Sequence, residues 1–145
     1  MYQKIDHLAI VVRDLDEALT LYRDTLGFEL SGVAAFPEIG IRQAFFPVGE
    51  SFFQLVEPTD PQGLVAKYLK EHDEGMYLIA VSVDDLRATL DGLKAKGARV
   101  VGDDPDNIAR GGLVFIHPRS AKGVLIQLIE RENRARQQAL ASQAK

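Results

Sequence analysis

The chain has 145 residues, 46% of them hydrophobic and 26% charged, which is the composition of a globular protein of about one domain. Its formal net charge of −4 argues against a general nucleic-acid binder, and the absence of cysteine excludes disulfide scaffolds, thiolate metal sites and cysteine nucleophiles. No apolar run approaches the ~20 residues that span a bilayer, and the N-terminus lacks the apolar core of a signal peptide. We therefore expect a cytoplasmic protein that binds neither nucleic acid nor membrane.

The first half of the chain predicts one strand, one helix and three further strands. An apolar strand is expected over residues 5–12, followed by a helix that starts with the capping pattern of Asp14 and Glu17. Gly27 is expected to end this helix in a left-handed conformation. The buried face of the helix is predicted to contain Leu15, Ala18, Leu19, Tyr22 and Leu26. The three strands follow over residues 28–33, 43–48 and 51–57, and a hairpin turn joins the last two.

A connector over residues 58–75 is predicted to contain a turn and a short helix with Leu64, Val65, Tyr68 and Leu69 on one side. The second half then predicts a strand over residues 76–83 and a helix that ends at Gly97. Three more strands are expected over residues 99–101, 112–117 and 124–130. The polar tail, residues 131–145, is expected to be a frayed helix or a disordered end.

The second half is a near-copy of the first. Residues 12–15 match residues 83–86 at an offset of 71, and residues 53–57 match residues 126–130 at an offset of 73. The order βαβββ therefore occurs twice, which predicts an α+β fold of two modules related by a pseudo-twofold axis, with an open barrel-like cleft. We expect a single domain over residues 1–130, with modules at 4–57 and 76–130.

This duplication predicts which positions face one another in the cleft. His7 in the first strand corresponds to Leu78, and Gln54 in the last strand corresponds to Gln127. An unpaired buried amide costs about 1–3 kcal/mol, so each glutamine needs some partner. His7 is a metal ligand, an acid–base group or a core histidine bonded to an amide. The glutamines are ligands, hydrogen-bond donors to a substrate carbonyl, or a mutually bonded pair.

The segments HLAIVVRDLDEALTLYRDTLGFEL, FPEIGIRQAFFPVG and FIHPRSAKGVLIQLIE make the chain similar to the vicinal oxygen chelate superfamily of glyoxalases, bleomycin resistance proteins and dioxygenases. Within it, the chain most resembles the methylmalonyl-CoA epimerases, over residues 4–130. The resemblance implies proton transfer next to a thioester or ketone carbonyl, with stabilisation of the enolate, in an epimerase-like or glyoxalase-like protein. It also implies a small-molecule substrate such as an acyl-CoA, and a homodimer.

The resemblance further implies a divalent metal (Co, Zn, Mn or Ni) held by His at position 7, Gln or Glu at 54, His at 78 and Glu at 127. This chain keeps His7 and Gln54 but has Leu78 and Gln127 at the other two positions. Metal affinity should be well below that of an intact site, because one imidazole and two amides supply no negative charge. Tyr77 could replace Leu78 only if the strand slipped by one residue, since neighbouring side chains point to opposite faces.

The resemblance also implies that Glu38 and Gln127 stand at the positions of the family's two acid–base residues. Glu38 is a candidate base, the alternative being an exposed loop carboxylate, whereas the amide of Gln127 cannot take up a proton at neutral pH. His117, Arg119 and Lys122 could contact phosphate groups, as in CoA, or belong to a solvated turn. The candidate substrate-binding residues are Tyr77, Arg110, His117, Arg119 and Lys122.

A second function also fits the sequence, because a metal-free protein that binds or sequesters a small molecule, such as a drug, would tolerate the loss of two metal ligands. An extradiol dioxygenase is disfavoured, since its two-histidine, one-carboxylate iron site cannot be assembled from positions 7, 54, 78 and 127.

Overall fold

The computed structural model describes residues 1–130, and in this range the element order is the predicted duplication. The first copy consists of β1 (Tyr2–Val11), α1 (Leu15–Leu19) with the π-helix η1 (Thr20–Thr25), β2 (Gly32–Phe36), β3 (Ile41–Val48) and β4 (Ser51–Pro58). The second consists of β5 (Gly75–Val83), α3 (Leu86–Ala95), β6 (Val100–Val101), β7 (Val114–Ile116) and β8 (Ile126–Glu130). Also present are α2 (Leu64–His72), α4 (Pro105–Ala109) and two 3-10 turns, η2 (Pro37–Ile39) and η3 (Pro118–Ser120). The predicted polar tail lies outside the described residues.

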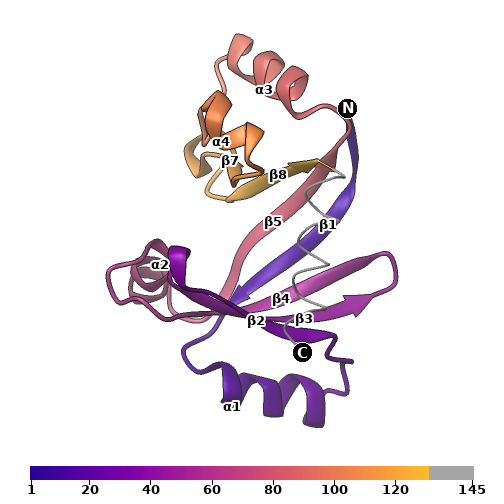
Figure 1. The fold of residues 1–145 in the computed structure, drawn as a ribbon, viewed down its shortest axis with the longest axis vertical. Helices are drawn as coiled ribbons and strands as arrows, with labels where there is room; N and C mark the ends of the chain where they lie inside the picture. The colour runs from indigo at the N-terminus through magenta and orange to yellow at the C-terminus, as the bar shows by residue number, and fades with distance from the viewer. Residues whose placement is uncertain (131–145) are drawn as a thin grey trace. The chain divides into compact units, whose positions relative to one another are not determined.

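The strands are hydrogen-bonded in the order β2-β3-β4-β1-β5-β8-β7-β6 (Figure 1). This confirms the predicted α+β class, and the sheet is open rather than closed into a barrel. The chain divides into two compact units. Leu8–Tyr77 forms one, here called the β3–β4 unit; Met1–His7 and the described residues from Leu78 onward form the other, here called the β7–β8 unit. Among residues 1–130, no helix is long and apolar enough to cross a membrane.

The two copies form the same hydrogen bonds at the start of their main helices. In both copies, an Asp at the N-cap accepts a hydrogen bond from the backbone N–H three residues later, as the capping pattern predicts. In both copies, the Glu at the end of the last strand accepts from the first backbone N–H of the helix. The bonds are Asp14 to Glu17 N and Asp85 to Ala88 N, each 3.0 Å, and Glu57 to Leu15 N and Glu130 to Leu86 N, each 2.6 Å. These bonds tie each helix to the last strand of its own copy and confirm both offsets.

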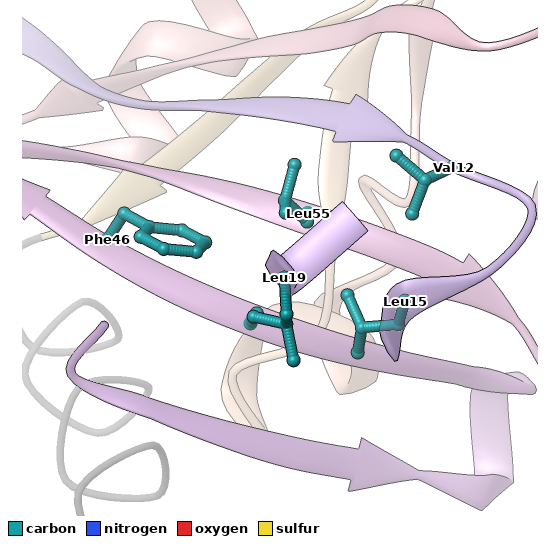
Figure 2. Close-up of a cluster of buried hydrophobic side chains, with 6 residues drawn as sticks. Val12, Leu15, Leu19, Phe46 and Leu55 are labelled. Carbon is teal, nitrogen blue, oxygen red and sulfur yellow. The ribbon is translucent and has the colours of Figure 1, made fainter. Parts of the chain in front are cut away.

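Each unit has its own hydrophobic core. In the β3–β4 unit, the helix and the strands enclose a cluster of buried side chains: Val12, Leu15, Leu19, Ala44, Phe46 and Leu55 (Figure 2). In the β7–β8 unit, the corresponding cluster is Val83, Leu86, Leu90, Val114, Ile116 and Leu128. Because side chains alternate along a strand, residues next to these on β4 and β8 face away from the helices. Gln54 and Gln127 are such residues.

Two predictions in the first half are wrong, and both concern the end of the first helix. Leu26 was expected on the buried face but is 54% exposed. The helix widens into a π-turn, in which Leu26 N donates to Leu21 O at 2.9 Å, and this i to i+5 bond rotates the last residues away from the core. The strand expected at Phe28 starts only at Gly32, because Phe28 N bonds to Tyr22 O at 3.0 Å and the Phe28 ring packs edge-on against Phe53.

Candidate functional site

His7 is 1% exposed and belongs to a buried pair with a neighbour that the sequence analysis did not single out. Its Nδ1 lies 2.9 Å from Oδ2 of Asp6, which is 0% exposed. A carboxylate acceptor at Nδ1 fixes the orientation of the ring. His7 therefore combines with a buried carboxylate in a pair that the repeat lacks in its second copy, where Tyr77 and Leu78 stand at these positions.

The position opposite His7 has no polar side chain. Asp84 N donates to Met1 O at 3.3 Å and Ser82 Oγ to Lys4 O at 3.5 Å, which orients β1 and β5 antiparallel in this unit. Counting along both strands from Met1 and Asp84 brings His7 opposite Leu78, as the repeat predicts. Leu78 is 7% exposed and offers no donor atom.

This donor set does not fit the divalent metal that the resemblance implies. Positions 7, 54 and 127 supply one imidazole and two neutral amides, and position 78 supplies nothing. Within residues 1–130 there is no group of three or more histidine, aspartate or glutamate side chains placed to hold a metal ion. Hard cations bind charged oxygens, and transition metals bind imidazoles and carboxylates, so two amides are a poor substitute.

Gln127 is a buried amide at the centre of its sheet face. Its partners across the strands are Ala80 on β5 and Phe115 on β7, so a methyl group and a phenyl ring flank it in one row. The residue is 5% exposed, and its amide makes no side-chain hydrogen bond within residues 1–130, although neither amide atom is among the fully buried atoms that lack a partner.

Gln54 has the corresponding place in the β3–β4 unit, where it is also 5% exposed. Its Oε1 accepts a hydrogen bond from Gln43 Nε2 at 3.3 Å, and its cross-strand partner on β3 is Phe45. Because the carbonyl oxygen is engaged, the Nε2 group of Gln54 remains as a donor, and it has no acceptor within the described residues. Phe45 and Phe52 on the same face make an apolar surrounding for this N–H group.

Glu38 lies on an exposed turn whose backbone is firmly held. It is the middle residue of η2, and the turn ends at Gly40 in a left-handed conformation with φ 67°. The O atom of Gly40 accepts from Thr59 N at 2.7 Å, and a Cβ at Gly40 would meet the Cβ of Asp60 at 2.6 Å. The glycine therefore permits a close contact that fixes the position from which the Glu38 carboxylate projects.

Tyr77 is half-buried and has a raised pKa, mainly because burial disfavours the phenolate and to a smaller extent because Tyr68 is near. The two rings meet edge to face with centroids 4.7 Å apart. A raised pKa keeps the hydroxyl protonated at neutral pH. Tyr77 is therefore suited to donate a hydrogen bond to a ligand rather than to act as a base.

His117, Arg119 and Lys122 lie together in the connection between β7 and β8, as the sequence places them. His117 caps η3, because its Nδ1 accepts from Arg119 N at 3.0 Å. Arg110 lies apart from this connection, at the end of α4, with its guanidinium 3.5 Å from Asn107 Oδ1. The glycines after Arg110 are explained by packing, since a Cβ at Gly112 would meet Asn107 Oδ1 at 1.9 Å.

The candidate residues thus fall into two sets, one in each unit. Glu38, Gln54 and Tyr77 belong to the β3–β4 unit, and His7, Gln127 and the cationic candidates belong to the β7–β8 unit. Sequence reasoning missed the residues that position them, namely Asp6 and Gln43. The identity of Asp6 as a charged residue within an apolar strand was the one available signal.

A family model, related sequences and solved structures all indicate the same superfamily for this chain. The model of the glyoxalase/bleomycin resistance protein/dioxygenase superfamily matches residues 6–115. An ethylmalonyl-CoA/methylmalonyl-CoA epimerase of Cereibacter sphaeroides is 32% identical over 131 residues, which cover 88% of this chain and 98% of that protein. A lactoylglutathione lyase of Haemophilus influenzae is 32% identical over 132 residues, which cover 90% of this chain and 94% of the lyase.

Among solved structures, a variant of the methylmalonyl-CoA epimerase of Streptomyces coelicolor in complex with 2-nitronate-propionyl-CoA matches with a TM-score of 0.80 and 34% identity. The match covers 90% of this chain and 95% of the epimerase. Structural neighbours of this chain therefore bind acyl-CoA ligands, and its relatives include both epimerases and glyoxalase-type lyases.

Proposed function

Because this chain belongs to the glyoxalase/bleomycin resistance protein/dioxygenase superfamily, we propose that it transfers a proton at the carbon next to the thioester carbonyl of an acyl-CoA. The observation that carries the proposal is the likeness, at 34% identity and a TM-score of 0.80, to an epimerase that binds a CoA ligand of this type. The chemistry is common to the related epimerases and is similar to the proton transfer of glyoxalase-type enzymes.

In the proposed reaction, the carboxylate of Glu38 takes the α-proton and the electron pair of the C–H bond moves into the thioester to form an enolate. The negative charge on the enolate oxygen requires hydrogen-bond donors in a site of low polarity. Gln54 offers its Nε2 group, whose own carbonyl is engaged by Gln43. Gln127 and His7, which belong to the β7–β8 unit, are further donors that the resemblance alone assigns. Return of the proton from Glu38 regenerates the thioester.

No step of this proposal runs through a metal, since the donor set at positions 7, 54, 78 and 127 does not fit one. The proposal also has a stereochemical consequence. Inversion at the α-carbon requires acid–base groups on both faces of the enolate. Gln127 cannot take up a proton, which leaves Glu38 as the only base. We therefore expect exchange of the α-proton on one face to be faster than inversion of the α-carbon.

The experiment that tests the proposal follows deuterium incorporation into the α-carbon of propionyl-CoA and methylmalonyl-CoA in D₂O by NMR. We expect incorporation with the wild type and its loss with Glu38→Gln. Glu29→Gln is the matched control, because Glu29 is an exposed carboxylate in the same unit. If the two variants have equal exchange rates, Glu38 is not the base.

A second function, binding without turnover, is favoured by one observation, the replacement of a metal-ligating histidine and a carboxylate by Leu78 and Gln127. In that case the wild type would bind CoA thioesters with no deuterium incorporation above the buffer rate. We also include in the proposal a cytoplasmic location and a homodimer, and light scattering coupled to size-exclusion chromatography measures the latter directly.

A further inference from the structure

The connection between β7 and β8 differs from its counterpart in the first copy of the repeat. In the first copy, β3 and β4 are joined by a tight hairpin in which Val48 pairs with Ser51. In the second copy, residues 117–125 form a wide loop that contains η3. Because β7 and β8 are shorter than β3 and β4, more of the second copy lies outside its strands at this point.

The loop lies in a stretch with a charge opposite to that of the whole chain. Residues 107–129 contain no aspartate or glutamate, although the chain has a net charge of −4. The cations of this stretch are Arg110, Arg119 and Lys122. Neither Arg119 nor Lys122 forms an ion pair with any carboxylate of residues 1–130.

A further cation is brought to the loop by backbone contacts. Arg99 N donates to Ser120 Oγ at 2.8 Å, and His117 N donates to Arg99 O at 2.9 Å. Arg99 also has no ion-pair partner within the described residues. Three cations without an ion-pair partner among residues 1–130, at positions 99, 119 and 122, thus belong to one loop and the strand end beside it.

Hydrogen bonds within the loop hold its backbone. His117 Nδ1 accepts from Arg119 N, and Pro118 O accepts from Ala121 N at 3.0 Å and from Gly123 N at 2.8 Å. Lys122 has φ 55°, a left-handed conformation that a glycine would adopt with less strain. A charged side chain kept at such a position is an outlier of the kind that occurs at binding sites.

We propose that this loop binds the phosphate groups of CoA through Arg99, Arg119 and Lys122. The inference rests on the proposed function for the identity of the ligand and specifies its subsite. Lys122 precedes Gln127 by five residues, a span of at most ~18 Å. The pantetheine arm separates the phosphates of CoA from its thioester by a distance of this order, so one ligand can reach both the loop and the amide of Gln127.

The test measures binding of CoA, adenosine 3′,5′-bisphosphate and pantetheine by calorimetry. The variant Arg99→Gln/Arg119→Gln/Lys122→Gln is expected to lose on the order of tenfold in affinity for both phosphorylated ligands and nothing for pantetheine. Affinity of the wild type for these two ligands should also fall as salt rises. The matched control is Arg23→Gln/Lys67→Gln/Lys70→Gln, which makes the same change in net charge on exposed residues of the β3–β4 unit.

Equal losses in the two triple variants would overturn the inference, because net charge alone would then explain the effect. Lys122→Gly separates binding from folding, since it removes the cation and relieves the left-handed strain. We expect weaker CoA binding with an unchanged or higher Tm, whereas unchanged CoA binding would exclude Lys122 from the subsite.

The two proposals can fail independently. If adenosine 3′,5′-bisphosphate binds to the loop but no thioester exchanges its α-proton, the subsite stands and the proposed activity does not. If thioesters of CoA and of pantetheine exchange with the same KM, the activity stands and the subsite does not.

Discussion

Replacing Gln127 by leucine tests the claim that this amide awaits a ligand. Gln127 is 5% exposed and lies between Ala80 and Phe115, and its amide makes no side-chain hydrogen bond within residues 1–130. An unpaired buried amide costs about 1–3 kcal/mol, and a leucine of similar volume does not incur this cost. Because the amide retains a trace of solvent contact, we expect the lower part of this range, about 1–2 kcal/mol of added stability.

Urea unfolding followed by circular dichroism measures this change, and for a chain of this length Tm should rise by roughly 3–8 °C. The matched control is Thr89→Val, at a polar residue of the same unit that is 1% exposed but satisfied, since Thr89 Oγ1 donates to Asp85 O at 2.7 Å. This control should lose about 1 kcal/mol. If Gln127→Leu is destabilised as much as Thr89→Val, the amide has a partner in the folded protein and our reasoning is wrong.

Three further predictions concern the metal, the Glu38 turn and the helix starts. Leu78→His/Gln127→Glu should bind Co²⁺ or Zn²⁺ much more tightly than the wild type by calorimetry, and no gain would show that positions 78 and 127 do not face the same site as His7. Gly40→Ala should lose more stability than Gly49→Ala, because both glycines have positive φ but only a Cβ at Gly40 meets another residue, Asp60; equal losses in thermal unfolding would remove the role of that contact. Glu57→Gln and Glu130→Gln should each cost about 1–2 kcal/mol, with the larger loss for Glu57, whose carboxylate also lies 3.4 Å from Arg42 Nε; no loss in either would contradict the helix-start bonds.

The duplicated fold was predictable because its signals are local and occur twice. Asp14 caps its helix as the sequence pattern predicts, and Asp85 forms the same cap in the second copy. Gly27 and Gly97 have the expected positive φ values of 81° and 85°. The end of the first helix was not predictable in this way. The π-turn that exposes Leu26 occurs where the Tyr22 and Phe28 rings pack against Phe53, and periodicity does not encode these long-range contacts.

The candidate site was predictable only in part. The repeat identified His7, Leu78, Gln54 and Gln127 as corresponding positions, because a duplication carries this information in its spacing. The contacts that surround these candidate residues depend on strand register and on loop conformation. Gln43 reaches Gln54 through the β3–β4 register, and Arg99 reaches Ser120 through the pairing of β6 with β7. No local pattern indicates such contacts.

The most direct measurement of the central claim compares two rates in D₂O with chelator-treated wild-type protein and a single epimer of methylmalonyl-CoA. One is deuterium incorporation at the α-carbon, followed by NMR, and the other is inversion of that carbon. A base at Glu38 without a metal predicts incorporation that survives the chelator and is faster than inversion. No incorporation above the buffer rate, or incorporation that chelator abolishes and Co²⁺ restores, would contradict the account.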